Sequence, residues 1–202
     1  MKKTCYIIGA GEIASLPLLC DCFVICADGG LRKAEEYGIK PDLIVGDFDS
    51  LGTVPNGNNV IVHPIEKDDT DMFLAVRCGI ERGFDDFVIY GGLGGRLDHT
   101  LANIQLLKYL AENEMSGVLV GDSTWITAIK NGRIDFEESD KGIISVFSLT
   151  DKSFGVTIKN FKYETDRVEL SSSFPLGVSN EFCGKKGSIS VEDGTLLIIR
   201  KE

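Results

Sequence analysis

The sequence predicts an α/β fold, with a parallel sheet in its first part and antiparallel β structure in its second. Up to about residue 115, short apolar runs alternate with segments of helical period, a pattern typical of a parallel sheet. From about residue 117, short β-rich runs alternate with turn residues. We place the domain change near residue 130, which gives domains 1–130 and 131–202.

The first part is built from short apolar runs that end at glycine or aspartate. Strands are predicted at 4–8, 22–27, 42–46, 60–63 and 86–90. A short helix is predicted from Leu31 to Tyr37, with Gly38 ending it.

Two longer helices follow from apolar residues repeated every three or four positions. One uses Met72, Ala75, Val76, Gly79 and Ile80. The other begins near Leu101 and continues through Ile104 and Leu107. After Ile8, Gly9 and Gly11 match a dinucleotide fingerprint only in part, because residue 14 is Ala. A tight strand–helix turn is the favoured interpretation there.

Carboxylates gather at the ends of these elements. Asp28 follows the second strand, and Asp47 and Asp49 follow the third. Carboxyl ends of parallel strands are where open α/β sheets bind ligands, and Mg²⁺ takes carboxylate oxygens together with substrate phosphates. We therefore expect Asp47 and Asp49 to hold a metal–nucleotide. A simple turn is the alternative, because Gly, Asp and Ser are turn residues.

The start of the next helix carries Lys67, Asp68, Asp69, Thr70 and Asp71. Acids at a helix N-terminus cap it and complement its dipole, which explains one of them. Helix capping does not explain why three acids and a lysine lie at the sheet edge that also carries Asp28 and Asp47.

A glycine loop follows the fifth strand, in the run GGLGGRLDHT from Gly91 to Thr100. Main-chain N–H groups of such a loop, with the N-terminus of the following helix, suit a phosphate chain. Arg96 can form a fork onto phosphate oxygens. The loop is not a Walker loop, since no Gly-Lys-Ser/Thr follows.

Composition limits the function classes. The net charge is −10, which is a poor match for nucleic-acid binding. Six cysteines include no CxxC pair and the chain has two histidines, so we expect no zinc site and reduced thiols. The apolar N-terminal run is broken at Gly9, too early for a membrane helix. We expect a cytoplasmic protein that handles small molecules and does not bind membranes.

Five motifs in order resemble the thiamine pyrophosphokinase (thiamine diphosphokinase) family across nearly the whole chain. They are ADGG (27–30), PDLIVGDFDS (41–50), KDDTD (67–71), GGLGGRLDHT (91–100) and GVSNEF (177–182). The resemblance implies an N-terminal Rossmann-like domain that binds Mg-ATP and a C-terminal β-sandwich that completes the thiamine site. It also implies that the thiamine hydroxyl attacks the β-phosphorus of ATP, giving thiamine diphosphate and AMP, in a homodimer with active sites at the subunit interface.

The resemblance also implies roles for individual residues. The catalytic acids are Asp28, Asp47, Asp49 and Asp71, of which Asp47, Asp49 and Asp71 bind Mg²⁺. The residues that bind ATP and its phosphates are Lys67, Asp68, Thr70, Gly91, Gly92, Gly94, Gly95, Arg96, Asp98 and His99. The thiamine side is carried by Tyr163, Ser179 and Asn180. Family members often place a Trp on the thiamine rings, and Tyr163 is the candidate here because the single Trp, Trp125, lies far from that motif.

Two alternatives remain open from the residues. Asp47-x-Asp49 after a strand also fits a phosphatase or mutase with an aspartate nucleophile. A sensor that binds nucleotide and thiamine without turnover would carry the same motifs.

Overall fold

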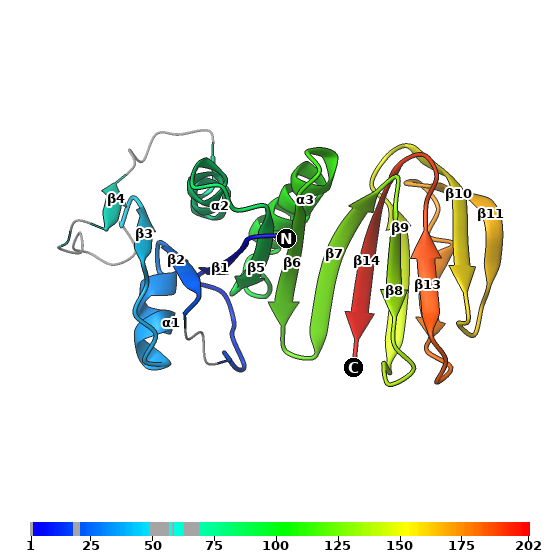
Figure 1. Cartoon of the computed structure of the whole chain (residues 1–202), viewed down its shortest axis with the longest axis horizontal. Helices are drawn as coiled ribbons and strands as arrows, with labels where there is room; N and C mark the ends of the chain where they lie inside the picture. The colour runs from blue at the N-terminus through cyan, green and yellow to red at the C-terminus, as the bar shows by residue number, and fades with distance from the viewer. Residues whose placement is uncertain (1, 18–20, 49–56, 58, 63–68) are drawn as a thin grey trace. The chain divides into compact units, whose positions relative to one another are not determined.

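The computed structural model of the chain describes residues 2–17, 21–48, 57, 59–62 and 69–202. It divides into two compact units (Figure 1). Unit 1 comprises Met1–Leu106 with Gly117–Asp122, and unit 2 comprises Leu107–Ser116 with Ser123–Glu202. The described strands form a larger sheet of mixed direction and a smaller antiparallel one.

Unit 1 contains the predicted parallel strands. They are β1 (Thr4–Ile8), β2 (Phe23–Ala27), β3 (Leu43–Gly46), β4 (Val60–Val62), β5 (Asp86–Tyr90) and β6 (Ser116–Gly121). Their order in the sheet is β6-β5-β1-β2-β3-β4. The pairs β5–β1, β1–β2, β2–β3 and β3–β4 are all parallel, as predicted. Because β1 lies between β2 and β5, the carboxyl ends of β1 and β5 flank the point where the chain reverses its direction of travel across the sheet.

Helices cover both faces of this sheet. Ala34 of α1 (Gly30–Glu36) packs in a cluster with Ile8 and Val24 on one face. On the other face, Gly79 of α2 (Asp71–Glu81) lies so close to Phe87 that an added Cβ would come within 2.6 Å of the ring. Successive strand residues point to opposite faces, so the two helices sandwich the sheet.

Helix boundaries follow local chemistry. Gly38 adopts a φ of +68° just after α1, as a C′ glycine does. The helix α2 begins at Asp71, because the Thr70 hydroxyl accepts a hydrogen bond from Phe73 N at 3.2 Å and caps it.

Two sequence expectations were wrong in detail. Residues 9–17 form no helix, so the Gly9–Gly11 segment is a loop rather than a strand–helix turn. The helix α3 (Leu97–Glu112) does not bury Leu101, which is 57% exposed. Its buried face carries Asn103, Leu106, Leu107 and Leu110 instead.

Unit 2 is antiparallel β structure, as predicted. Its strands are β7 (Thr124–Lys130), β8 (Arg133–Phe136), β9 (Ile143–Ser148), β10 (Lys152–Lys159), β11 (Thr165–Ser171), β12 (Gly177–Glu181), β13 (Gly187–Ser190) and β14 (Thr195–Lys201). They form the runs β12-β9-β14-β7 and β11-β10-β13-β8, and each pair within a run is antiparallel.

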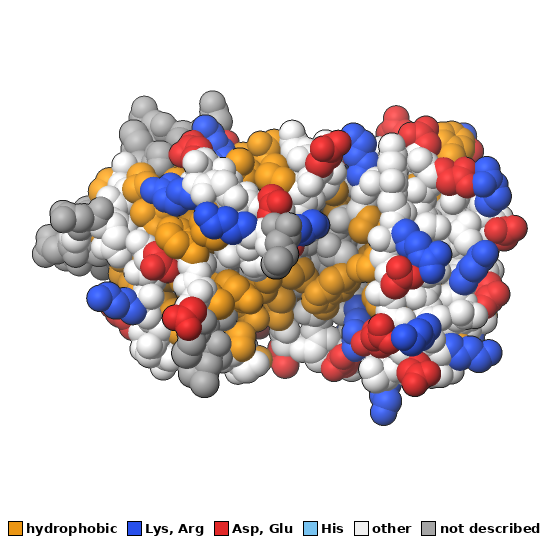
Figure 2. Space-filling model, viewed as in Figure 1, with side chains coloured by type: hydrophobic (Ala, Val, Ile, Leu, Met, Phe, Trp, Pro, Cys, Tyr) orange, Lys and Arg blue, Asp and Glu red, His pale blue; other side chains and the backbone are white. Residues whose placement is uncertain are grey.

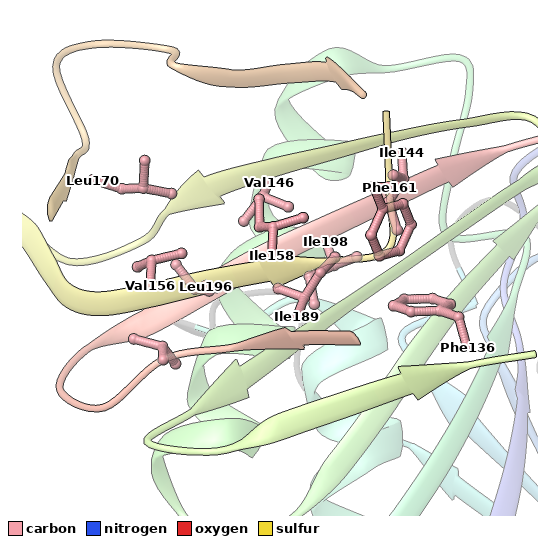
Figure 3. Packing of buried hydrophobic residues seen from close by; sticks show 11 residues of the cluster. Phe136, Ile144, Val146, Val156, Ile158, Phe161, Leu170, Ile189, Leu196 and Ile198 are labelled. Carbon is pink, nitrogen blue, oxygen red and sulfur yellow. The ribbon is translucent and has the colours of Figure 1, made fainter. Parts of the chain in front are cut away.

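The core of unit 2 draws on both runs of strands. Ile144 and Ile198 come from one run, and Val156 and Ile189 come from the other (Figure 3). At one end, the rings of Phe136 and Phe161 meet edge to face, with centroids 5.7 Å apart. The residues of this core all belong to unit 2.

The surface of unit 2 carries interspersed charges of both signs (Figure 2). Exposed pairs such as Lys152–Glu169 and Lys186–Glu137 account for some of them. Within the described ranges, no helix has the length and hydropathy that a bilayer crossing requires.

Candidate active site

Unit 1 has a cavity of about 570 Å³ at the carboxyl end of its sheet. Most of the predicted site residues of this unit line it: Asp28, Asp47, Thr70, Asp71, Gly91, Gly92, Gly94, Gly95, Arg96 and His99. The cavity therefore brings together residues from the second strand to the last helix of the unit. Asp49, Lys67 and Asp68 were predicted to join them but lie outside the described residues.

The ends of β2 and β3 set the positions of Asp28 and Asp47. Asp28 N donates a hydrogen bond to Val45 O at 2.7 Å, and Asp28 has a φ of +43°. A Cβ on Gly46 would lie 3.0 Å from the Asp28 Cα, so a glycine lets the two strand ends approach. Because the two main chains pack closely, Asp28 and Asp47 line the same cavity.

Phe48 directly follows Asp47 and is buried. This residue has a φ of +60° and is only 2% exposed, packed in the cluster that contains Ile8 and Ile44. A buried aromatic in the left-handed region is costly and needs firm support. Asp47, the residue before Phe48, lines the cavity, so the burial of Phe48 supports the position of Asp47.

The start of α2 contributes Asp69, Thr70 and Asp71 to the cavity lining. Asp69 is paired with Arg77, with 2.7 Å between Oδ2 and the guanidinium nitrogen, although it also lines the cavity. The Thr70 hydroxyl is used as the helix cap. Asp71 lies in the first turn, where a carboxylate is favoured by the helix dipole.

Two glycine segments cross at the ends of β1 and β5. Gly9 N donates to Tyr90 O at 2.8 Å, and Gly11 N donates to Gly91 O at 2.9 Å. A Cβ on Gly11 would lie 2.6 Å from Gly91 O, so the crossing requires glycine. Gly9 and Gly11 line the cavity but were not among the predicted site residues. The partial Gly-x-Gly signal after a strand was the cue for them.

The glycine loop is followed by Arg96, whose guanidinium pairs with Asp98. Its guanidinium donates to both carboxylate oxygens of Asp98, at 3.2 and 2.6 Å. This hydrogen bonding lowers the pKa of Asp98 to about 2 and raises the pKa of Arg96. Arg96 lines the cavity, while Asp98 holds its planar fork. The structure therefore links Asp98 to the site through Arg96.

Asn103 was missed by sequence reasoning. It is only 6% exposed, lines the cavity, and its Nδ2 donates to Gly92 O at 2.7 Å. It lies one helical turn after His99 on α3, and so ties the glycine loop to the helix. The signal was a polar residue at helical spacing before Leu106, Leu107 and Leu110.

The predicted thiamine-side residues lie in unit 2. The Tyr163 side chain is 59% exposed, and Lys162 Nζ lies 5.5 Å from its ring centroid. Ser179 is exposed, with a φ of +61°. Asn180 is only 4% exposed, and its amide bonds to the main chain of Tyr163. Unit 2 therefore brings the three residues together, with Tyr163 and Ser179 on the surface and Asn180 beneath them.

Among the described residues, no group of three or more His, Cys, Asp or Glu side chains is arranged to hold a metal ion by itself. The cavity nevertheless has hard oxygen donors in Asp28, Asp47 and Asp71. Mg²⁺ commonly takes one or two carboxylates, with substrate phosphates supplying other ligands. The donor set therefore fits a magnesium–nucleotide.

Comparison with protein families gives two matches. Residues 18–119 match "Thiamin pyrophosphokinase, catalytic domain", and residues 132–196 match "Thiamin pyrophosphokinase, vitamin B1 binding domain". The chain is 31% identical over 183 residues to the thiamine pyrophosphokinase of Bacillus subtilis (strain 168), covering 87% of this chain and 86% of that protein. It is 24% identical over 170 residues to thiamin pyrophosphokinase 1 of Caenorhabditis elegans, covering 78% and 70%.

Solved structures agree with the sequence comparisons. A crystal structure of thiamine pyrophosphokinase from Bacillus subtilis has a TM-score of 0.85 at 28% identity, covering 98% of this chain and 99% of that one. The thiamin pyrophosphokinase of Geobacillus thermodenitrificans has a TM-score of 0.84 at 27% identity, covering 98% and 97%. The enzyme from Candida albicans, at 18% identity and a TM-score of 0.81, covers 100% and 90% and shows the shared fold.

Proposed function

The chain belongs to the thiamin pyrophosphokinase family and transfers a pyrophosphoryl group from ATP to thiamine, and we propose that the cavity of unit 1 is where it does so. The product is thiamine diphosphate. The observation that supports this site is that carboxylates and a glycine loop line one cavity. Family membership favours this enzyme over the phosphatase and the sensor that the sequence left open.

The glycine side of the cavity would bind the phosphate chain. Gly94 and Gly95 adopt φ values of +82° and +62°, which a residue with a side chain rarely does, and α3 begins two residues later. The helix N-terminus gives this loop a positive potential. Arg96, held by Asp98, presents a planar fork that suits phosphate oxygens.

The acid side would bind the reacting end. Asp47 and Asp71, with Asp49 outside the described residues, would hold Mg²⁺, whose charge would neutralise the phosphate chain. In the reaction the thiamine oxygen bonds to the β-phosphorus, and the bond from that phosphorus to the oxygen bridging to the α-phosphorus breaks. AMP leaves, and one carboxylate, with Asp28 a candidate, accepts the hydroxyl proton.

Unit 2 would bind thiamine. The exposed ring of Tyr163 is the candidate for stacking on the thiamine rings, and Ser179 is a candidate for a polar contact. Asn180 would act by holding Tyr163, since its amide already bonds to that residue's main chain.

We propose a homodimer whose active sites each draw on both chains. Exposed apolar side chains on unit 2, at Phe174, Leu176 and Val178, support an association surface. We further assign residues 1–130 to a Rossmann-like Mg-ATP domain and 131–202 to a β-sandwich domain. We also propose a cytoplasmic location, which is supported by the reduced thiols of Cys5, Cys26 and Cys78 in the core.

Phosphorus NMR of the protein with Mg-ATP and thiamine tests the activity. Thiamine diphosphate and AMP should appear together in equal amounts. Appearance of ADP and thiamine monophosphate would be the signature of a different transfer. Release of inorganic phosphate from ATP without a thiamine product would indicate a phosphatase.

A further inference from the structure

The exposed ring of Tyr163 lies beside a cation that belongs to the chain itself. Lys162 Nζ lies over the ring, 5.5 Å from its centroid, and the same nitrogen is 2.5 Å from Oε1 of Glu181. An aromatic face and a carboxylate are the two kinds of partner that attract organic cations in proteins. The ring and the carboxylate therefore form a cation-binding site on unit 2, and the ammonium of Lys162 occupies it.

The main chains that carry this site are tied together within unit 2. Phe161 belongs to the buried core (Figure 3) and forms an antiparallel β-bridge with Phe182. The next residue, Lys162, donates its main-chain N–H to Glu181 O at 3.0 Å. These bonds do not involve the side chains of Lys162 and Glu181. Either charge can therefore be removed by substitution while the main-chain contacts remain.

The side chain of Lys162 is the member of the site that can leave it. It is 46% exposed, so water can solvate the ammonium away from the ring. Tyr163 and Glu181, in contrast, are both bonded through their main-chain N–H groups to the buried amide of Asn180. Hydrogen bonding to the Glu181 carboxylate raises the pKa of Lys162, so this side chain is charged at neutral pH. When it leaves, the site loses a positive charge, which a second cation can restore.

Thiamine has the chemistry of such a cation, because its thiazolium is a flat aromatic ring with a permanent positive charge. We propose that Lys162 is an intramolecular competitor for this ring, and that thiamine displaces its ammonium from Tyr163 and Glu181. This inference rests on the proposed function, because it takes Tyr163 as the residue that stacks on thiamine. Lys162 then lowers the affinity for thiamine, and the Glu181 carboxylate raises it.

Removing the competitor should tighten thiamine binding. Lys162→Met keeps a long, unbranched side chain and removes the charge. Calorimetry with thiamine in the absence of ATP should give a dissociation constant about threefold to tenfold lower, the range for an exposed ion pair together with a cation–π contact. Adding Glu181→Gln to this variant should weaken thiamine binding again by about threefold, because the carboxylate no longer attracts the thiazolium.

Two ligands that differ in charge separate this role from a structural one. The free thiazole half of thiamine is uncharged, whereas its N-methyl salt carries the thiazolium charge. NMR titration gives the dissociation constant of each. Lys162→Met should tighten binding of the N-methyl salt and leave that of the uncharged thiazole within about twofold. Equal changes for the two ligands would mean that the variant alters the shape of the site, and would overturn the proposal.

Lys152→Met is the matched control. Lys152 also forms an exposed ion pair, at 2.8 Å from Glu169, but it lies at the opposite end of the β10–β11 hairpin from Tyr163. This variant should leave thiamine binding unchanged, and thermal melts show which variants fold. Unchanged or weaker thiamine binding in folded Lys162→Met overturns the proposal.

The competitor and the proposed thiamine site fail separately. Loss of thiamine binding in Tyr163→Ala, with no change in Lys162→Met, overturns the competitor alone. No loss in Tyr163→Ala overturns the proposed stacking residue as well. Because these measurements need no turnover, they do not depend on the phosphorus NMR experiment that tests the activity.

Discussion

The buried amide of Asn180 holds both main-chain polar groups of Tyr163. Its Oδ1 accepts a hydrogen bond from Tyr163 N at 2.9 Å, and its Nδ2 donates to Tyr163 O at 2.6 Å. The same Oδ1 also accepts from Glu181 N at 2.9 Å. The orientation of the exposed Tyr163 ring therefore depends on a side chain that is 4% exposed.

Asn180→Ala should raise the KM for thiamine while leaving the KM for ATP unchanged. The variant leaves Tyr163 N and O without their partner, at a cost of about 1–3 kcal/mol in the free energy of unfolding. Ser153→Ala is the control, because Ser153 is fully buried in unit 2 and bonds to Ser148 at 2.8 Å. Equal thiamine KM values in the two variants would reduce Asn180 to a structural residue.

Asp47→Asn should lower kcat by about 100-fold or more while the fold survives. Asparagine keeps the shape of the side chain and removes the charge that metal binding and proton transfer require. Without metal, clustered carboxylates repel each other, so the variant should melt no lower than the wild type in EDTA.

Asp135→Asn is the control for Asp47. Asp135 is an exposed carboxylate of unit 2, paired with Arg133 at 2.6 Å. The kcat of both variants is measured by steady-state kinetics at saturating Mg²⁺. Near-normal kcat in Asp47→Asn would remove this residue from the catalytic group.

Arg96→Ala should weaken ATP binding or slow transfer by about tenfold or more, because a charged hydrogen bond to phosphate is lost. Arg96→Lys should recover only part of this, because lysine lacks the planar fork. Arg133→Ala is the control, since Arg133 also pairs with the aspartate two residues later and is similarly exposed. Wild-type kinetics in Arg96→Ala would show that its pairing with Asp98 has no part in catalysis.

The Asp98 carboxyl should titrate near pH 2 in the folded protein. Its pKa lies below the ordinary 3.8 because Arg96 donates hydrogen bonds to the charged form. For a lowered pKa, the stabilising contribution is present above pH 3.8 and is lost as the pH falls towards 2. The Arg96–Asp98 pair should thus persist unchanged across the neutral range.

Carbon NMR of the Asp98 carboxyl measures this pKa. In Arg96→Ala the midpoint should rise towards 3.8, the ordinary value. A midpoint near 3.8 in the wild-type protein would mean that the pair does not form in solution.

Shared active sites would show in mixed dimers. Asp47→Asn chains and chains carrying both Tyr163→Ala and Ser179→Ala should each be inactive alone. After subunit exchange, half of the dimers are mixed and each has one intact site, so about a quarter of wild-type activity should return. Activity that does not return after verified exchange would assign each site to a single chain.

Much of the fold followed from the sequence because short buried strands and helical spacing are local signals. The parallel strands and the acids at their ends were predicted from runs such as Leu43 to Gly46, followed by Asp47. Leu101 was not placed correctly, because which face of α3 is buried depends on the sheet that it meets. Asn103 was not singled out from the sequence, because its partner, Gly92 O, lies eleven residues earlier in the chain.

The site was harder to predict where main-chain geometry decides it. The crossing of Gly11 over Gly91 joins segments eighty residues apart, and a two-glycine signal carries no information about its partner. Likewise, the sequence motif grouped Ser179 with Asn180. The structure separates an exposed Ser179 from a buried Asn180 that bonds to Tyr163.

The transfer of an intact pyrophosphoryl group is the central claim, and isotopic labelling tests it most directly. Parallel reactions with thiamine use ATP labelled with ³²P at the β-phosphorus or at the γ-phosphorus. Thiamine diphosphate should carry both labels in equal amount, and both should be lost in Asp47→Asn. Thiamine diphosphate that carries γ label but no β label would show stepwise transfer of single phosphates and would contradict the account.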